Sequence, residues 1–357
     1  MKGRSLPGAL VISLDFELHW GVRDRVATSD PYVRNLLGGR EAIPRLLDTF
    51  DTFDIAATWA TVGFLFASSR RELEDASPTV RPSYVETDLS PYGEQIGDSE
   101  ADDPLHFAPS LIELIGRTSR QEIATHTFSH FYCGEKGQDK EAFRADIEAA
   151  RAIAARKGIR LQSIVFPRNQ HNPRYDEILL ANGITAYRGT PDAWAWRFDN
   201  GRQSRAVGKR AGRALDTYVN LFGHGTTSWA RVLQPSGLSN IRASRLLAPH
   251  RPGASRLESL RLQRICEGIH SAARAGEIFH LWWHPHNFGS FLHDNLVFLR
   301  KLLAEFVRAR ERYGMLSVTM TEVDDLVRLE LGESLPSRSE GNPGESIKSH
   351  SLGSSHG

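Results

Sequence analysis

The feature that most constrains the fold is a repeated alternation of short apolar segments with longer amphipathic ones. Apolar runs of strand length include Ala9–Leu14, Ile55–Thr61 and Leu161–Phe166, and segments with helical periodicity, such as Arg40–Thr52 and Lys140–Lys157, lie between them. A strand that is apolar throughout is buried on both faces, and such strands alternating with helices are typical of parallel sheets. The sequence therefore predicts an α/β fold in which helices cover a parallel sheet.

Polar side chains follow several of the predicted strands directly. Acids follow Ala9–Leu14, histidines follow Glu122–Thr125, an arginine follows Leu161–Phe166, and a histidine follows Glu277–Trp283. The carboxyl ends of barrel strands meet at one mouth, so a barrel would bring these side chains together. An open doubly wound sheet would fit the same alternation, but no glycine-rich phosphate loop follows the first strand. We therefore predict a barrel.

The pattern places the barrel in a single domain, residues 1–331, with an insertion at about 69–103. The insertion contains acids, prolines, glycines and serines without periodicity, which indicates a long surface segment. It could cover a substrate, or it could be an excursion without function. Beyond Gly332 a similar composition predicts a disordered tail, residues 332–357.

The overall composition excludes several kinds of partner. The chain has 357 residues, of which 40% are hydrophobic and 24% charged, as in an ordinary soluble domain with a large core. A formal net charge of +1 gives no reason to expect nucleic acid or an anionic membrane as the main partner. Two cysteines, Cys133 and Cys266, do not make a disulfide framework. The run Ala9–Leu14 is too short for a signal-peptide core or a membrane span, so we expect a cytoplasmic protein.

The pair His126 and His130 is the first candidate for chemistry. Two histidines four apart on one helical turn point the same way, so both rings could reach one ion. Neutral imidazole is a common ligand of zinc and similar metals, and a catalytic site adds a third protein ligand and an open position. Taken alone, the spacing also fits a helix that merely exposes two histidines.

Four motifs together resemble the polysaccharide deacetylase family, also called NodB-homology or carbohydrate esterase family 4 proteins. They are Ser13-Leu-Asp-Phe-Glu17, His126-Thr-Phe-Ser-His130, Phe166-Pro-Arg-Asn169 and Leu281-Trp-Trp-His284. The histidine motif matches the family pattern fully, whereas the two acids are two apart instead of adjacent and the arginine motif matches approximately. The resemblance covers about Ala9 to Leu331 and implies a distorted barrel of the (β/α)7 type.

The resemblance implies a divalent metal, with zinc as the expected ion. Glu17 is similar to the family's carboxylate ligand and would bind the metal beside His126 and His130. Asp15 resembles the base that activates the catalytic water. Alternation along an extended segment sends Asp15 and Glu17 to the same side, so both can face one site. Because the spacing of the acids departs from the family pattern, the two roles could be exchanged, and one acid could instead cap the following segment.

The same resemblance implies roles for the arginine and the late histidine. Arg168 would pair with Asp15 and hold it ionised. His284 would be the general acid that protonates the departing amine, although His280 or His286 offers the same imidazole chemistry. His280 is expected to pack within its strand.

Substrate contacts are expected beside the general acid. Trp283 and His286 are the candidate substrate-binding residues, because an aromatic surface suits a sugar ring or an acyl group. Core packing is the competing interpretation for at least one residue of the pair Trp282 and Trp283. Cys133, three residues after His130, is expected to be a small buried neighbour and not a ligand.

The implied activity is the hydrolysis of an N-acetyl group on an amino sugar or glycan precursor, and so a step in polysaccharide biosynthesis. The oxyanion of the reaction would be held by the metal and by a backbone N–H after Thr127. Two other functions stay open. One is the hydrolysis of a small non-sugar amide or ureide on the same fold. The other is a catalytically inactive relative that binds a sugar or a protein.

Overall fold

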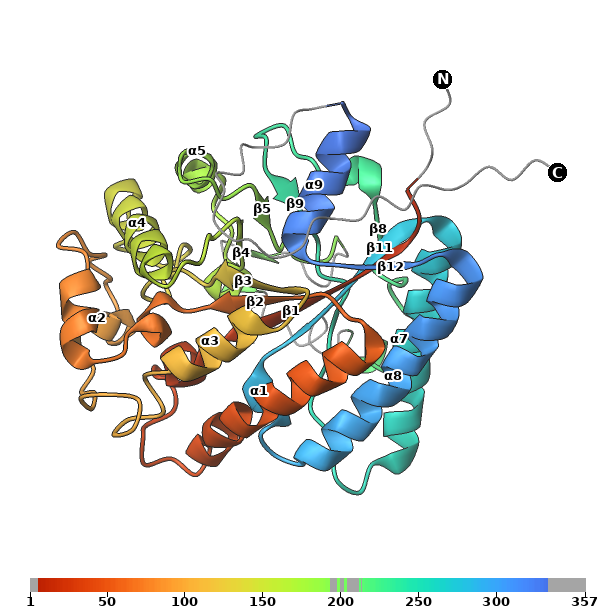
Figure 1. The fold of residues 1–357 in the computed structure, drawn as a ribbon, viewed down its shortest axis with the longest axis horizontal. Coiled ribbons are helices and arrows are strands. Elements are labelled where there is room, and N and C mark those ends of the chain that lie inside the picture. The colour runs from red at the N-terminus through yellow and green to blue at the C-terminus, as the bar shows by residue number, and fades with distance from the viewer. Residues whose placement is uncertain (1–5, 193–197, 200–201, 204–211, 213, 333–357) are drawn as a thin grey trace.

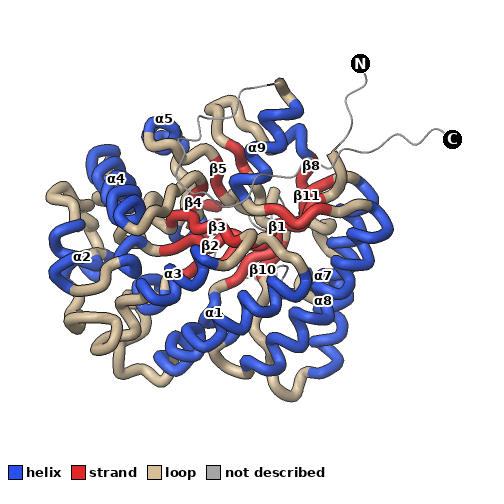
Figure 2. The backbone as a smooth tube through the Cα atoms, viewed as in Figure 1, coloured by secondary structure: helices blue, strands red, loops and turns tan. Residues whose placement is uncertain are grey.

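The computed structural model describes residues 6–192, 198–199, 202–203, 212 and 214–332. Its strands lie in the centre and its helices surround them (Figures 1 and 2). The predicted tail at 332–357 falls, except for Gly332, outside the described residues. Within the described part of the chain, no helix is both long and apolar enough to cross a membrane.

Strand β1 (Ala9–Phe16) is the middle of the sheet and is buried along its whole length. Its even-numbered side chains, such as Leu10 and Leu14, join the large core between the sheet and the outer helices. Its odd-numbered apolar side chains, Ala9 and Val11, join a second core on the opposite face. This period of two places Ser13 and Asp15 on the same face as Val11, which is the inside of the curved sheet.

The main sheet is mostly parallel and follows the order β10-β11-β1-β2-β3-β4-β5-β9. One edge of β1 pairs with β11, whereas the other edge is shared by β12 near its start and β2 near its end. Strand β8 adds to β11 in the antiparallel direction, and β6 and β7 form a separate antiparallel pair. The bounds of the other strands are β2 (Ala57–Thr61), β3 (Gln121–Thr125), β4 (Ser163–Ile164), β5 (Ala186–Tyr187), β6 (Phe198–Asp199), β7 (Arg202–Gln203), β8 (Thr227–Ser228), β9 (Ser239–Asn240), β10 (Arg245–Leu246), β11 (Glu277–Trp283) and β12 (Leu316–Val318).

The helices lie on the outside of the sheet, and along one side α8 packs against both α1 and α7 (Figure 1). Side-chain caps begin several of them: Asp139 accepts from the N–H of Ala142 at the start of α4, and Thr319 and Glu322 form a reciprocal capping box at the start of α9. The bounds are α1 (Val33–Phe53), α2 (Arg70–Ala76), α3 (Pro109–Arg117), α4 (Lys140–Arg156), α5 (Asp176–Ala181), α7 (Ser255–Ala275), α8 (Leu292–Tyr313) and α9 (Met320–Glu330).

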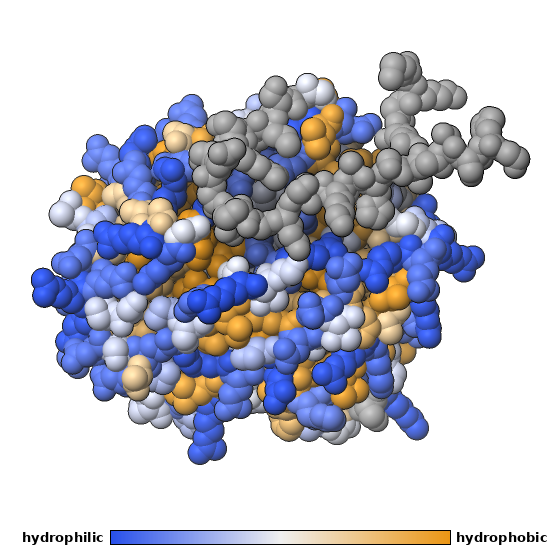
Figure 3. Space-filling view, in the orientation of Figure 1, coloured by the Kyte–Doolittle hydropathy of each residue, from blue (hydrophilic) through white to orange (hydrophobic). Residues whose placement is uncertain are grey.

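The predicted α/β barrel of parallel strands covered by helices is confirmed, with differences in detail. The strands predicted at Leu161–Phe166 and Ile184–Tyr187 pair over only two residues each. The segment 69–103 begins with helix α2, whose N-cap Ser69 accepts from the N–H of Glu72, and continues through two short 3-10 helices. On the face shown in Figure 3, hydrophilic side chains predominate around the rim and hydrophobic atoms show nearer the centre.

Candidate active site

The acids Asp15 and Glu17 stand at the carboxyl end of β1 and are nearly buried, with 4% and 5% of their surface exposed. Asp15 lies on the inner face of the sheet because of the strand alternation described above. Glu17 is the residue before the short 3-10 helix η1 (Leu18–Gly21), where Leu18 turns the chain with a φ of 45°. The carboxylate of Glu17 lies over Gly21, so closely that a β-carbon there would fall 1.9 Å from its Cδ.

His126 and His130 follow β3 on a loop, so the prediction that they share a helical turn is wrong. Thr127 and His130 have left-handed backbones, with φ of 65° and 56°. The loop is held by side chains instead of by helical hydrogen bonds. Asp146 on α4 accepts the backbone N–H groups of Phe128 (2.7 Å) and Ser129 (3.1 Å) and the hydroxyl of Ser129.

The hydrogen bonds of this loop also show that the predicted oxyanion contact is wrong. The N–H after Thr127 belongs to Phe128 and already donates to Asp146, so it does not face a substrate. The hydroxyl of Thr127 accepts the N–H of Phe131 at 2.6 Å, which closes the loop from the other side. Burial raises the pKa of Asp146 to about 6, while its hydrogen-bond donors oppose this rise.

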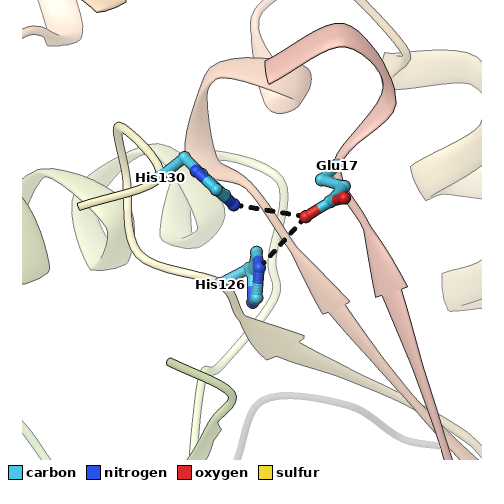
Figure 4. Close-up of side chains that lie close together, drawn as sticks. All are labelled: Glu17, His126 and His130. Atoms are coloured by element: carbon cyan, nitrogen blue, oxygen red, sulfur yellow. Dashed lines mark hydrogen bonds and ion pairs between the residues drawn. The ribbon is translucent and has the colours of Figure 1, made fainter. Parts of the chain in front are cut away.

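Glu17, His126 and His130 converge on one point although they come from two different strands (Figure 4). Oε2 of Glu17 lies 3.3 Å from Nε2 of His126 and 3.2 Å from Nε2 of His130. Two atoms that each bind a zinc ion at about 2.0–2.1 Å with a tetrahedral angle are roughly 3.3 Å apart. All three ligand atoms lie within 4.8 Å of one another. These residues therefore fit a single divalent metal ion.

The protonation states of these groups suit a metal ligand set. Burial lowers the pKa of His130 to about 4, which leaves its ring neutral near pH 7. Burial opposes ionisation of Glu17, but His284, His126 and His130 together hold the pKa of its carboxyl well below the usual value. The Nδ1 atoms of His126 and His130 are buried and make no hydrogen bond within the described residues, so packing sets the orientation of both rings.

Asp15 pairs with Arg188, which the sequence interpretation overlooked. Nη1 of Arg188 lies 2.6 Å from Oδ1 of Asp15, and Nη2 lies 2.7 Å from Oδ2. Nη1 also donates to the hydroxyl of Ser13 at 3.0 Å, and the arginine side chain is completely buried. Burial would raise the pKa of Asp15, but the charge and hydrogen bonds of Arg188 hold it below its usual value. The base candidate is therefore ionised.

The predicted pairing of Arg168 with Asp15 is wrong. Arg168 instead donates to Asp24 at 2.6 Å and to Glu135 at 3.2 Å, and its guanidinium lies 4.2 Å from the ring centre of Tyr132. It sits at a left-handed turn, with a φ of 55°. Arg188 follows β5 just as Arg168 follows the predicted strand Leu161–Phe166, so the same sequence signal could have indicated it.

His284 stands between the two acids at the end of β11. Its Nε2 lies 3.4 Å from Oε1 of Glu17 and 3.7 Å from Oδ2 of Asp15, and 25% of its side chain is exposed. His286 lies next to it, with ring centres 4.9 Å apart, and is 5% exposed. Burial lowers the pKa of His286 to about 3. His280 lies deeper, where its Nε2 accepts from the hydroxyl of Ser13 at 2.8 Å.

Trp283 is not on the substrate side, so its predicted contact with substrate is wrong. It is 0% exposed and packs in the outer core, stacked on Phe288 at 5.6 Å. The alternation of β11 sends the neighbouring Trp282 to the inner face. There the indole lies 4.2 Å from the guanidinium of Arg188 and 5.6 Å from the ring of His284. Trp282 is thus the partly exposed aromatic side chain beside the acids.

A cavity of about 520 Å³ adjoins this cluster. Asn169 lies in its wall, and the same side chain accepts a hydrogen bond from Arg188 at 3.0 Å. The wall also contains the polar side chains of His171, Asp192 and Arg242 beside apolar groups. These side chains offer hydrogen-bonding groups to a polar ligand.

Comparison with known proteins gives the fold a precedent. No protein-family model matches the chain, and no curated protein matches it. A Mycobacterium smegmatis protein assigned as a polysaccharide deacetylase superposes with a TM-score of 0.57 and 14% identity, over 94% of this chain and 96% of that one. A Pseudomonas aeruginosa protein with the same assignment gives a TM-score of 0.54 and 11% identity, over 90% and 91% of the two chains.

The chain has the polysaccharide-deacetylase fold. Puue allantoinase also superposes, with a TM-score of 0.50 and 11% identity over 90% of each chain. The fold expected from the four motifs is thereby confirmed. At these identities the likeness concerns the fold alone, so the chemistry has to be argued from the residues of this site.

Proposed function

We propose that the protein is a metal-dependent hydrolase that removes an N-acetyl group from an amino sugar or glycan precursor. The observation that carries the proposal is the convergence of Glu17, His126 and His130 on one point, with Asp15 and His284 on its border. Structures assigned as polysaccharide deacetylases share the fold, which supports the proposal without establishing the activity.

Glu17, His126 and His130 would hold the metal, and zinc suits two imidazoles and one carboxylate. When bound, a divalent ion of this kind acidifies water and polarises a carbonyl group. The geometry favours Glu17 over Asp15 as the carboxylate ligand. Both oxygens of Asp15 are engaged by Arg188, whereas Oε2 of Glu17 faces both histidines.

Asp15 would then act as the base. Its carboxylate takes a proton from the attacking water, whose oxygen forms a bond with the carbonyl carbon of the substrate amide. Arg188 keeps that carboxylate ionised and fixes its plane through two parallel hydrogen bonds. Arg168, which has no contact with Asp15, would act only at the rim of the site through Asp24 and Glu135.

His284 would supply the second proton. As the C–N bond breaks, the imidazolium of His284 donates to the amine nitrogen, and the products are acetate and a free amine. Its partial exposure allows contact with a substrate, and its Nε2 lies near both carboxylates. Trp282 offers a flat face beside this step, and the ring of His286 stacks on the ring of His284.

The test is a panel of N-acetylated amino sugars and cyclic ureides incubated with the zinc-loaded protein. We expect acetate release from at least one sugar, and loss of release after chelation or in the His126→Ala variant. Ammonia or ureide turnover without acetate would favour the second candidate, a ureide hydrolase, which the allantoinase fold makes reasonable. No turnover together with no bound metal would favour the inactive binding relative.

A further inference from the structure

A second pair of buried histidines lies outside the proposed active site. His19 belongs to η1, the short helix after β1, and His106 lies between the insertion at 69–103 and α3. Each is 1% exposed. Nδ1 of His19 lies 2.9 Å from Nε2 of His106, although the two residues are 87 positions apart in the chain.

The outer nitrogen of each ring has a partner that only accepts hydrogen bonds. Nε2 of His19 lies 2.7 Å from the carbonyl oxygen of Val26, so this nitrogen must carry the proton. Nδ1 of His106 lies 2.7 Å from the carboxylate of Asp103. That carboxylate also accepts the N–H of Gly97 at 2.8 Å, so it is an acceptor and the imidazole is the donor.

The consequence concerns the two inner nitrogens. In neutral rings whose outer nitrogens carry the protons, Nδ1 of His19 and Nε2 of His106 each present a lone pair to the other. Two lone pairs 2.9 Å apart repel, so a positive species has to lie between or beside them. Either one extra proton is shared by the rings, or a metal cation binds both.

The position of Glu94 favours a bound metal cation over a shared proton. One oxygen of its carboxylate, one ring nitrogen of His19 and one ring nitrogen of His106 lie within 4.8 Å of one another, and Glu94 is half-buried. Histidines that bind metals usually donate their other ring N–H to a carboxylate or a backbone carbonyl, which is the arrangement of both rings here. The inner nitrogens are roughly 0.4 Å closer than two ligands of a tetrahedral zinc, a difference that a small rotation of either ring removes.

We propose that Nδ1 of His19, Nε2 of His106 and the carboxylate of Glu94 form a second divalent-metal site, of the zinc type. The site shares no ligand with Glu17, His126 and His130, so it goes beyond the proposed function. It would fasten the end of the insertion to the turn that carries Glu17. The segment that follows the insertion already contacts that turn, because the indole N–H of Trp20 donates to the carbonyl of His106 at 3.0 Å.

The experiment measures bound zinc per chain after equilibrium dialysis against buffered zinc. We expect two ions in the wild-type protein, one in the His126→Ala/His130→Ala variant, and one in His106→Gln. Glutamine keeps a donor near the place of Nε2 and so preserves the hydrogen bond to His19, but it is a poor zinc ligand. Zinc should also raise the melting temperature of the His126→Ala/His130→Ala protein by several degrees, and should no longer do so when His106→Gln is added.

Replacing a buried histidine can prevent folding, so a second variant changes the half-buried ligand instead. Glu94→Gln leaves the histidine pair intact and should weaken zinc binding at the second site by at least 10-fold. Glu74→Gln, an exposed residue at the other end of the same insertion, is the matched control and should change nothing.

The outcomes separate this proposal from the proposed function. A single ion that survives in His126→Ala/His130→Ala but is lost in His106→Gln would support the second site and contradict the active-site metal. Two results would overturn the second site. One is a single bound ion that is lost only when His126 and His130 are replaced. The other is two ions that both persist in His106→Gln and bind as tightly in Glu94→Gln. The histidines would then share a proton.

Discussion

Gly21→Ala is the perturbation that tests the placement of Glu17 most selectively. The nearest atoms to an added β-carbon at Gly21 are the Cδ and two oxygens of the Glu17 carboxylate, at 1.9, 2.2 and 2.3 Å. Carbon atoms in ordinary contact stay about 3.4 Å or more apart, so the carboxylate has to retreat by roughly 1.5 Å. Metal ligands tolerate displacements of about 0.2 Å, so Glu17 can no longer bind an ion held by His126 and His130.

The expected result is a large loss of metal affinity in a protein that still folds. Zinc binding at the Glu17 site, measured by competition with a chromophoric chelator in the His106→Gln background, should weaken by about 100-fold or more, beyond the effect of a typical supporting residue. Gly21 is not in the left-handed region, so alanine causes no backbone strain, and the displaced carboxylate should cost the metal-free protein no more than about 1–3 kcal/mol.

The matched control for this variant is Gly116→Ala in α3. An added β-carbon there meets only Cδ1 of Ile123, at an ordinary 3.5 Å. This variant should bind zinc as the parent does. Unchanged zinc affinity in a folded Gly21→Ala protein would refute the assignment of Glu17 as a ligand.

Three further predictions concern the acids and their buried neighbours. Arg188→Met should lower the free energy of unfolding in urea by about 3–5 kcal/mol, because it leaves the buried carboxylate of Asp15 without its partner. A loss below about 1 kcal/mol would contradict the ion pair. Asp15→Asn should keep metal affinity but lower turnover at least ~100-fold, whereas Glu17→Gln should bind metal weakly and regain rate with excess metal; the reverse pattern would exchange the two roles. Burial, reinforced by Arg188, lowers the pKa of His280 to about 3, so below pH 6.5 the unfolded chain takes up a proton that the folded protein does not. Wild-type stability should therefore fall by about 2 kcal/mol between pH 7 and pH 5 from this group, and a His280→Gln variant that fell by the same amount would contradict the buried neutral ring.

The sequence predicted the layers and the location of the site because both depend on local pattern. Apolar strands identified the parallel sheet, and polar residues directly after strands marked its mouth. Asp15, Glu17, His126, His130 and His284 indeed lie together there. The assignment of their chemical roles stays a proposal, since position alone does not reveal which group binds, ionises or donates.

Contacts across the barrel could not be predicted from the same pattern. Arg168 and Arg188 both follow strand segments, and only the turn after each strand decides which one reaches Asp15. Trp282 and Trp283 sit on a strand that is apolar on both faces, so its alternation cannot be read from composition. The spacing of the histidine pair fits a helical turn, whereas Asp146, from the next helix in the chain, holds the segment as a loop through hydrogen bonds to its backbone.

The most direct test of the account is anomalous diffraction at the zinc edge from crystals of the zinc-loaded protein. We predict a peak about 2.0–2.2 Å from the Glu17 carboxylate and from Nε2 of His126 and His130, with Asp15 still paired to Arg188. A zinc-loaded crystal with no peak among these three residues, or with the ion on Asp15 in place of Glu17, would contradict it.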